Sequence, residues 1–266
     1  MPSAQHLTMA TAFALIQDIH ASARRVGVMP FVLQFDNLAT HAQYLKAYEI
    51  TQKSIFAGAR VLDWGCGNGH FSFLLDELGA EVTGYSFDPP PACMANSRHF
   101  TYVAGSEDDP RTIPFPEATF DFVCSVGVLE HVWETGGTEV GSLAEVARVL
   151  KPGGVFLCFH LPNERGWVEP FFRLLGLQQY HHKRRYNRES IRALWSAGGI
   201  SIADVGTYNF LPRNVLSRLP GPIRHSTMFA RLYNAIDRAA NALLGRFSTN
   251  FYVTGRRRCG VASTCT

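Results

Sequence analysis

The sequence lacks any run of about 18 consecutive apolar residues, the length that a membrane-spanning helix requires. Its first 19 residues also lack the basic start and the small-residue cleavage site of a signal peptide. Internal repeats and low-complexity tracts are absent as well, which argues against a repeat protein. We therefore expect a soluble protein, for which contact with a membrane surface stays open.

Cysteines are few, and none are paired in the Cys-x-x-Cys spacing of a metal or redox site. The six stand at positions 66, 93, 124, 158, 259 and 265, four of them in apolar runs. A free cysteine in such a run behaves as a small hydrophobic residue. This pattern favours a reducing, cytoplasmic location.

Charge of one sign is also scarce, because 25 Lys and Arg residues against 22 Asp and Glu residues leave a net charge of +3. That balance is too small to indicate a nucleic-acid-binding protein. The chain is 46% apolar and 18% charged, which excludes a disordered protein. We expect a helical cap over residues 1–57, a main domain over 58–258 with a helical insertion at 209–247, and a tail at 259–266.

The spacing of apolar residues predicts the secondary structure. Apolar residues three or four positions apart predict helices over 6–25 and 37–56, after which short apolar runs alternate with helical patterns. The predicted strands are 60–64, 81–85, 100–103, 119–126, 155–160, 200–208 and 251–256, and the later helices are 71–78, 140–150, 188–197 and 229–244. Such alternation is typical of α/β proteins with a mostly parallel sheet.

The loop after the first predicted strand carries glycines at positions 65, 67 and 69. Glycines let a backbone turn sharply and approach a ligand, and open α/β sheets bind ligands at this edge. The dinucleotide fingerprint Gly-x-Gly-x-x-Gly is not met, because His70 stands at its sixth position. Asp63 would project a carboxylate into the crevice, where it would repel a pyrophosphate and attract an ammonium group. The loop therefore favours a cationic ligand that bears an amino acid.

Four segments in order resemble the class I S-adenosylmethionine-dependent methyltransferases, most of all the type 11 branch with the ubiquinone and menaquinone biosynthesis enzymes. They are 61–70, 114–121, 126–132 and 143–154. The resemblance implies a Rossmann-like, doubly wound, mostly parallel seven-stranded sheet, S-adenosyl-L-methionine as cofactor, and methyl transfer to a small-molecule acceptor. A lipid, a quinone-like or a glycosyl acceptor fits, with O-methylation favoured and nucleic acid disfavoured. A non-catalytic binding or regulatory protein with this fold is the alternative.

The resemblance also implies a set of cofactor-binding residues: Asp63, Gly65, Cys66, Gly67, Ser86, Asp88, Glu107, Asp108, Val126 and Gly127. The sequence departs from the family at the ribose, because Ser86 stands where the family has an acid. Either Asp88 reaches back to the ribose, or Ser86 makes a weaker neutral bond. The acid that contacts adenine is displaced too, so Glu107 or Asp108 takes that role or belongs to a solvated loop.

The activated methyl group of the cofactor makes alignment the main task, and alignment contributes about 7–11 kcal/mol in favourable cases. A base is needed only if the acceptor loses a proton, as a hydroxyl does. His131, after the fourth predicted strand, is the candidate catalytic base, and His160 is a second candidate. For His131, fixing the loop or contacting the cofactor is the alternative; for His160, it is a buried structural role.

Two later segments suggest contacts with the acceptor or with a surface. Residues 180–186 form the one concentrated basic run, which suits an anionic acceptor, an anionic membrane or a solvated loop. His181 and His182 are adjacent and cannot serve as i, i+4 helix ligands, so no metal site is expected. The insertion is apolar on one side and arginine-rich on the other. It fits a lid, an interfacial helix or a helix packed on the sheet edge.

Overall fold

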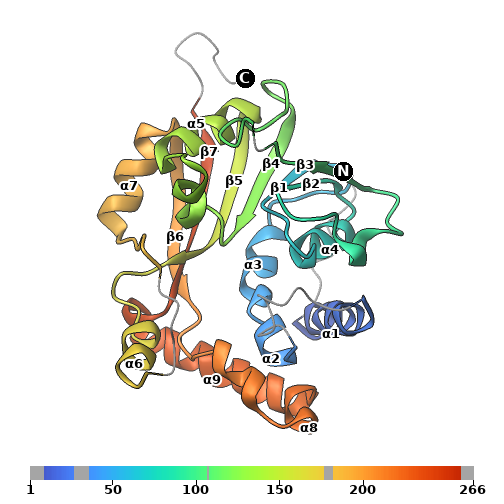
Figure 1. The fold of residues 1–266 in the computed structure, drawn as a ribbon, viewed down its shortest axis with the longest axis vertical. Helices are drawn as coiled ribbons and strands as arrows, with labels where there is room; N and C mark the ends of the chain where they lie inside the picture. The colour runs from blue at the N-terminus through green and yellow to red at the C-terminus, as the bar shows by residue number, and fades with distance from the viewer. Residues whose placement is uncertain (1–8, 27–35, 107, 177–181, 259–266) are drawn as a thin grey trace.

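The computed structural model of the 266-residue chain describes residues 9–26, 36–106, 108–176 and 182–258 (Figure 1). At its centre is a seven-stranded sheet of order β3-β2-β1-β4-β5-β7-β6. The strands are β1 (Arg60–Trp64), β2 (Glu81–Ser86), β3 (Phe100–Ala104), β4 (Phe120–Val126), β5 (Leu150–Pro162), β6 (Ile200–Tyr208) and β7 (Asn250–Arg257). Strands β1 to β5 are parallel, and β7 runs antiparallel to β5 and β6. The predicted α/β class with a mostly parallel seven-stranded sheet is confirmed.

Short polar side chains cap the starts of α2, α5, α7 and α9. Asn187 starts α7 with a capping box, and Ser226 accepts the Phe229 N–H at the start of α9; such caps satisfy N–H groups that the helix leaves unpaired. The α-helices are α1 (Met9–Val26), α2 (Leu38–His41), α3 (Tyr44–Thr51), α4 (His70–Glu77), α5 (Glu139–Val149), α6 (Val168–Leu174), α7 (Arg188–Ala197), α8 (Gly221–Arg224) and α9 (Thr227–Leu244). Short 3₁₀ helices are η2 (Ala92–Met94), η3 (Leu129–Thr135), η4 (Asn214–Arg218) and η5 (Gly245–Phe247). None of the helices in the described ranges is both long and apolar enough to cross a bilayer.

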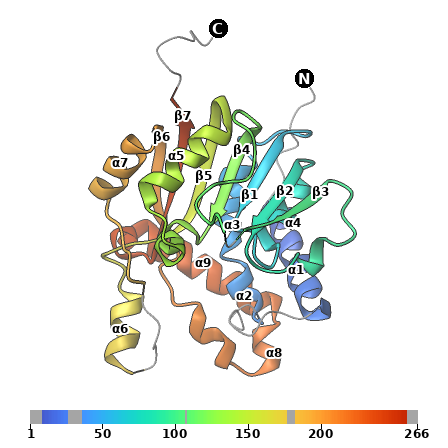
Figure 2. The same cartoon turned by 45° about the horizontal axis from the view of Figure 1, so that its top comes forward.

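Helices cover both faces of the sheet, so it has a hydrophobic core on each side (Figure 2). Successive strand residues point to opposite faces. On β1, Val61 joins the core that α1, α3 and α4 cover, and Leu62 joins the core that α5 and α7 cover. Leu74 of α4 and Trp195 of α7 are among the largest fully buried side chains. These two cores fix the sheet and hold the carboxyl ends of β1 to β5 at one edge.

Several elements differ from the predicted ones. Strand β5 begins at Leu150, earlier than predicted, because Leu150 pairs with Phe120 beyond a register shift in β4. The helix predicted over 37–56 is two helices, α2 and α3. Helices η3 and α6 were not predicted, and both lie beside the cavity described below.

Candidate active site

A cavity of about 1020 Å³ opens at the carboxyl ends of the central strands. Its walls come from the segments 64–68 after β1, 85–88 at the end of β2 and 126–128 after β4, and from His160 in β5. Strands β2 and β4 lie on opposite sides of β1, so the order in which successive strands join the sheet reverses there. Open α/β sheets bind ligands at such switch points.

The glycine loop forms the floor of this cavity, and its backbone leaves no room for a side chain at position 65. Gly65 has φ +77°, and a Cβ there would lie 2.3 Å from Cγ2 of Val128. Its N–H donates to the carbonyl of Tyr85 at 2.7 Å, which ties the loop to β2. Gly67 has φ +48°, and Cys66 between the two is buried. Only glycine fits position 65 without strain and collision.

Asp63 is buried, with 1% exposure, and it is not part of the cavity wall. Its Oδ2 accepts a 2.6 Å hydrogen bond from Oγ of Ser72. Burial raises the pKa of Asp63 to about 6. Burial raises the pKa of Tyr44 as well, and the Asp63 charge adds to that shift. Because Tyr44 lines the cavity, the charge of Asp63 acts close to the cavity wall although Asp63 is not part of that wall.

The structure brings Ser86 and Asp88 together beside the glycine loop. Oγ of Ser86 donates to Oδ2 of Asp88 at 3.1 Å and accepts the Asp88 N–H at 3.1 Å. A Cβ on Gly67 would lie 3.9 Å from that same Oδ2. Tyr102 supports the turn by donating to the carbonyl of Ser86 at 2.9 Å. Ser86 therefore holds the carboxylate of Asp88 next to the loop.

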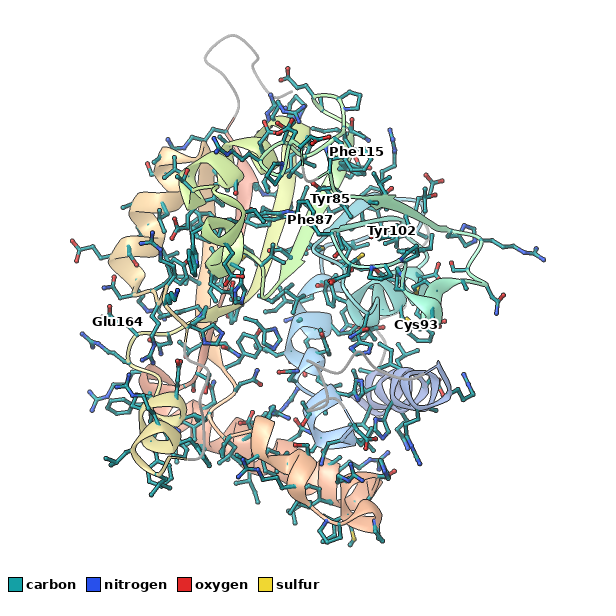
Figure 3. The ribbon with its side chains drawn as sticks, viewed as in Figure 1. Tyr85, Phe87, Cys93, Tyr102, Phe115 and Glu164 are labelled. Atoms are coloured by element: carbon teal, nitrogen blue, oxygen red, sulfur yellow. The ribbon has the colours of Figure 1, made fainter. Side chains whose placement is uncertain are left out.

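Of the two acids predicted to contact adenine, only Asp108 lies among the described residues. Glu107 lies outside the described residues, and Asp108 is exposed and does not line the cavity. Phe87 does line it, and its ring covers Gly105, where a Cβ would lie 2.5 Å from Cε1. Figure 3 shows this ring near Tyr85, whose centroid is 6.0 Å away. Sequence reasoning missed Phe87, although it stands between the two residues proposed for the ribose.

Glu130, His131 and His182 meet at the wall of the same cavity. One potential ligand atom from each lies within 4.8 Å of the other two. Glu130 is 3% exposed, and burial raises its pKa to about 7. The backbone places the first two on η3, and His182 arrives from the basic run, of which residues 180 and 181 lie outside the described part. Sequence reasoning found His131 and missed the other two members of this cluster.

His160 is held by hydrogen bonds on both ring nitrogens. Its Nε2 lies 2.9 Å from Oε1 of Gln43, and Nδ1 lies 3.1 Å from the Tyr208 hydroxyl. An amide oxygen only accepts, so Nε2 carries the proton and Nδ1 accepts from Tyr208. Burial, with the nearby Arg213 charge, lowers the pKa of His160 to about 3. A neutral histidine whose acceptor nitrogen is already bonded suits positioning better than proton transfer.

Arg213 closes the cavity from the insertion. It is buried and lines the cavity, and its Nη2 binds Oδ2 of Asp237 at 3.0 Å and Oδ1 of Asn234 at 2.9 Å. Its Nη1 donates to the carbonyl of Ala39, and its own carbonyl accepts from Thr40 Oγ1 at 3.2 Å. The N-terminal helices and the insertion are therefore bonded to each other at this end.

Comparison with known proteins decides the family. Residues 62–158 match the sequence model of a methyltransferase domain, over the segment that builds the glycine loop and β4. Residues 62–158 are therefore a domain of the class I S-adenosylmethionine-dependent methyltransferase type. S-adenosylmethionine is the methyl donor of this family.

The methyltransferase domain has similar relatives in several bacteria. A demethylmenaquinone methyltransferase of Tropheryma whipplei is 34% identical over 125 residues, which are 45% of this chain and 49% of that protein. The chain thus spans about half the length of that relative. A ubiquinone biosynthesis O-methyltransferase of Pseudomonas aeruginosa is 29% identical over 188 residues, 64% of this chain and 77% of that protein. The structure of an S-adenosylmethionine-dependent methyltransferase from Thermotoga maritima shares the fold, with a TM-score of 0.54, 15% identity and coverage of 92% and 100%.

The residues around the glycine loop fit the family's methyl donor. The missing side chains at Gly65 and Gly67 let backbone approach the ligand, and Val126 and Gly127 line the same cavity. The carboxylate of Asp88 beside Gly67 is of the type that accepts hydrogen bonds from a ribose diol. Phe87 offers an aromatic surface on the same side.

Proposed function

We propose that this methyltransferase transfers a methyl group from S-adenosylmethionine to a hydroxyl of a small, partly apolar acceptor, either quinone-like or lipid. The observation that carries the proposal is that one cavity is lined both by the glycine loop and by Glu130, His131 and His182. The names of the menaquinone and ubiquinone relatives support a quinone-like acceptor. Apolar side chains of α6, among them Val168 and Phe172, line the acceptor end.

When bound, S-adenosylmethionine supplies an activated methyl group, so the residues of the chain mainly have to align the acceptor and receive its proton. In the proposed reaction His131 accepts the hydroxyl proton. Glu134 orients its ring, since Nδ1 lies 2.9 Å from Oε1 of Glu134. The oxygen–methyl bond forms as the sulfur–methyl bond breaks, and S-adenosylhomocysteine leaves. Asp63, Gly65, Cys66, Gly67, Ser86, Asp88, Val126 and Gly127 form the proposed cofactor site.

The proposed cap (1–57) and insertion (209–247) cover the acceptor end. Their support is the set of bonds from Arg213 to Ala39, Thr40 and Asp237. The core of the proposed methyltransferase domain, 58–258, supplies the cofactor end.

We also propose that the acceptor arrives from an anionic membrane surface on which α6 and α9 rest. These helices lie at the same end of the molecule in both views (Figures 1 and 2), and the Trp167 N–H bonds the carbonyl of Phe247 at 3.1 Å. They expose Phe171, Leu174, Met228, Leu232, Ile236, Leu243 and Leu244.

Charge supports an anionic partner for this surface. The acids of the two helices, Glu169 and Asp237, are buried, whereas Arg173 and Arg231 are exposed. Arg238 is exposed too, and it forms an ion pair with Glu49. Apolar side chains flanked by arginines suit an interfacial helix on anionic lipid. Sedimentation with phosphatidylglycerol vesicles tests the contact: the chain should bind them and not phosphatidylcholine vesicles. Equal binding of Leu232→Asp and the parent would contradict it.

Calorimetric titration tests the cofactor assignment. The chain should bind S-adenosylmethionine and S-adenosylhomocysteine and should not bind NAD, and Asp63→Ala should lose that binding while its circular dichroism stays unchanged. Asp109→Ala, at an exposed position that is not part of the proposed cofactor site, serves as the matched control. Unchanged affinity in Asp63→Ala would contradict the placement of the ammonium group. Cofactor binding without methyl transfer to any hydroxylated acceptor would favour the non-catalytic alternative.

A further inference from the structure

We propose that Glu130, His131 and His182 bind a divalent transition-metal cation, Zn²⁺ by preference, at the acceptor end of the cavity. The proposal rests on three potential ligand atoms, one from each side chain, that lie within 4.8 Å of one another. Two imidazoles and one carboxylate are a ligand set of catalytic zinc sites, in which the fourth position stays open for water or substrate. Mg²⁺ is disfavoured, because it prefers oxygen ligands.

Glu130 provides the first independent support. Glu130 is 3% exposed and therefore 97% buried, and it lines the cavity. Among the described residues, its Oε2 has no hydrogen-bond partner. Buried carboxylate oxygens without partners are rare in folded proteins. A cation beside this oxygen would satisfy it, which explains a carboxylate at this position.

The two histidines provide the second support, because each has a carboxylate behind it. Nδ1 of His131 lies 2.9 Å from Oε1 of Glu134, and Nδ1 of His182 lies 3.4 Å from Oε2 of Glu169. Glu169 also accepts the backbone N–H of His182 at 2.7 Å. A carboxylate at Nδ1 fixes the tautomer and directs Nε2 to a metal, as in carboxylate–histidine–zinc arrangements.

The cluster has to contract slightly to hold a cation. Zinc bonds of about 2.0–2.1 Å in a tetrahedron place ligand atoms about 3.4 Å apart, compared with up to 4.8 Å here. His131 has a side chain that is 35% exposed, so its ring has room to turn. Arg184 and Arg185 follow His182 in the chain and would repel a bound cation. Arg184 lies 3.5 Å from Glu139 and Arg185 lies 3.9 Å from Glu169, and these carboxylates offset that repulsion.

The cation has a role in the proposed methyl transfer, and this part of the inference rests on the proposed function. An acceptor hydroxyl in the open position loses its proton more easily, because a bound cation lowers the pKa of the oxygen that it holds. The proton then leaves to solvent, the oxygen takes the methyl group, and His131 acts as a ligand instead of as the base.

Metal titration of the full chain, stripped with EDTA and free of acceptor, tests the site. We expect one Zn²⁺ per chain by calorimetry and the visible absorption of tetrahedral Co²⁺. His182→Gln should weaken zinc binding at least tenfold, and Glu130→Gln should do the same. His99→Gln, an exposed histidine outside the cavity wall, is the matched control and should bind as the parent does.

Two results would overturn the inference: no stoichiometric zinc binding by the parent, or equal binding by the parent, His182→Gln and Glu130→Gln. Circular dichroism identifies a variant that fails to fold. Glu169→Gln then takes the place of that variant: Glu169 contacts His182 and not the cation, so the expected loss of zinc affinity is smaller. Titration with S-adenosylmethionine before zinc is added keeps the two proposals apart. Cofactor binding without zinc binding refutes the metal site alone, and zinc binding without cofactor binding refutes the proposed function alone.

Discussion

Removing the carboxylate of Asp237 should destabilise the chain far more than removing a carboxylate from an exposed ion pair. Asp237 and Arg213 are 5% and 6% exposed, and Oδ2 of Asp237 lies 3.0 Å from Nη2 of Arg213. Oδ1 accepts the Leu211 N–H at 2.7 Å. Asp237→Ala would leave a buried guanidinium without its counter-charge and a partly buried N–H without its acceptor. Breaking a buried pair in this way costs about 3–5 kcal/mol.

The pair between Glu117 and Arg257 provides the matched control. Glu117 is 64% exposed in this pair, and an exposed ion pair contributes about 0–1 kcal/mol. Urea unfolding followed by circular dichroism should therefore show a large fall in the midpoint for Asp237→Ala and a small one for Glu117→Ala. Asp237→Asn, which keeps an acceptor oxygen, should fall between them. Equal free energies of unfolding for the two alanine variants would refute the reasoning.

Three further predictions follow from backbone geometry, burial and one hydrogen bond. Gly65→Ala should abolish S-adenosylmethionine binding in calorimetry, since its Cβ would lie 2.3 Å from Cγ2 of Val128 at φ +77°; Gly153→Ala, at φ +73° with open space around it, should keep binding and lose only about 1–2 kcal/mol of stability. Burial lowers the pKa of His70 to about 4, below its unfolded value of about 6.5. The neutral ring therefore contributes its full stability above pH 6.5 and loses about 3 kcal/mol as the pH falls to 4; urea midpoints across this range should fall less in His70→Gln than in the parent, and parallel curves would contradict the assignment. Tyr208→Phe removes the hydroxyl that accepts the backbone N–H of His160 at 2.8 Å. The free energy of unfolding in urea should fall by about 1–3 kcal/mol. Tyr252→Phe, whose hydroxyl makes an exposed bond to Asp204, should cost less than about 1 kcal/mol, and a reversed order would count against the role of Tyr208.

Most of the sheet could be predicted, because its strands are short apolar runs bounded by glycine, proline or charge. Strand β1 matches its predicted bounds, as do β6 and α7. The boundary errors arise where tertiary pairing overrides the local pattern. Leu150 belongs to β5 because Phe120 pairs with it, and no local signal in the sequence marks that pairing.

The candidate site could be predicted only where one loop builds it. Gly65 and Gly67 lie in a continuous segment whose spacing is informative by itself. Glu130 and His182, in contrast, meet only because η3 and the segment before α7 converge on the same cavity wall. In the sequence, His182 has only the adjacent His181 as a possible second ligand, so no metal site is predicted there. Chain neighbours say little about ligands that come from different elements.

Helix α9 shows why an amphipathic pattern does not identify its buried face. Leu232, Ile236 and Leu243 share one side, as the spacing predicts, and the usual expectation is that such a side packs inward. Here that side is exposed, and the buried side carries Asn234 and Asp237. Arg213 explains the inversion, because a buried guanidinium requires these two acceptors more strongly than the sheet requires another apolar face. The inversion leaves apolar side chains in water next to exposed arginines, and this cost is removed if the face rests on an anionic membrane.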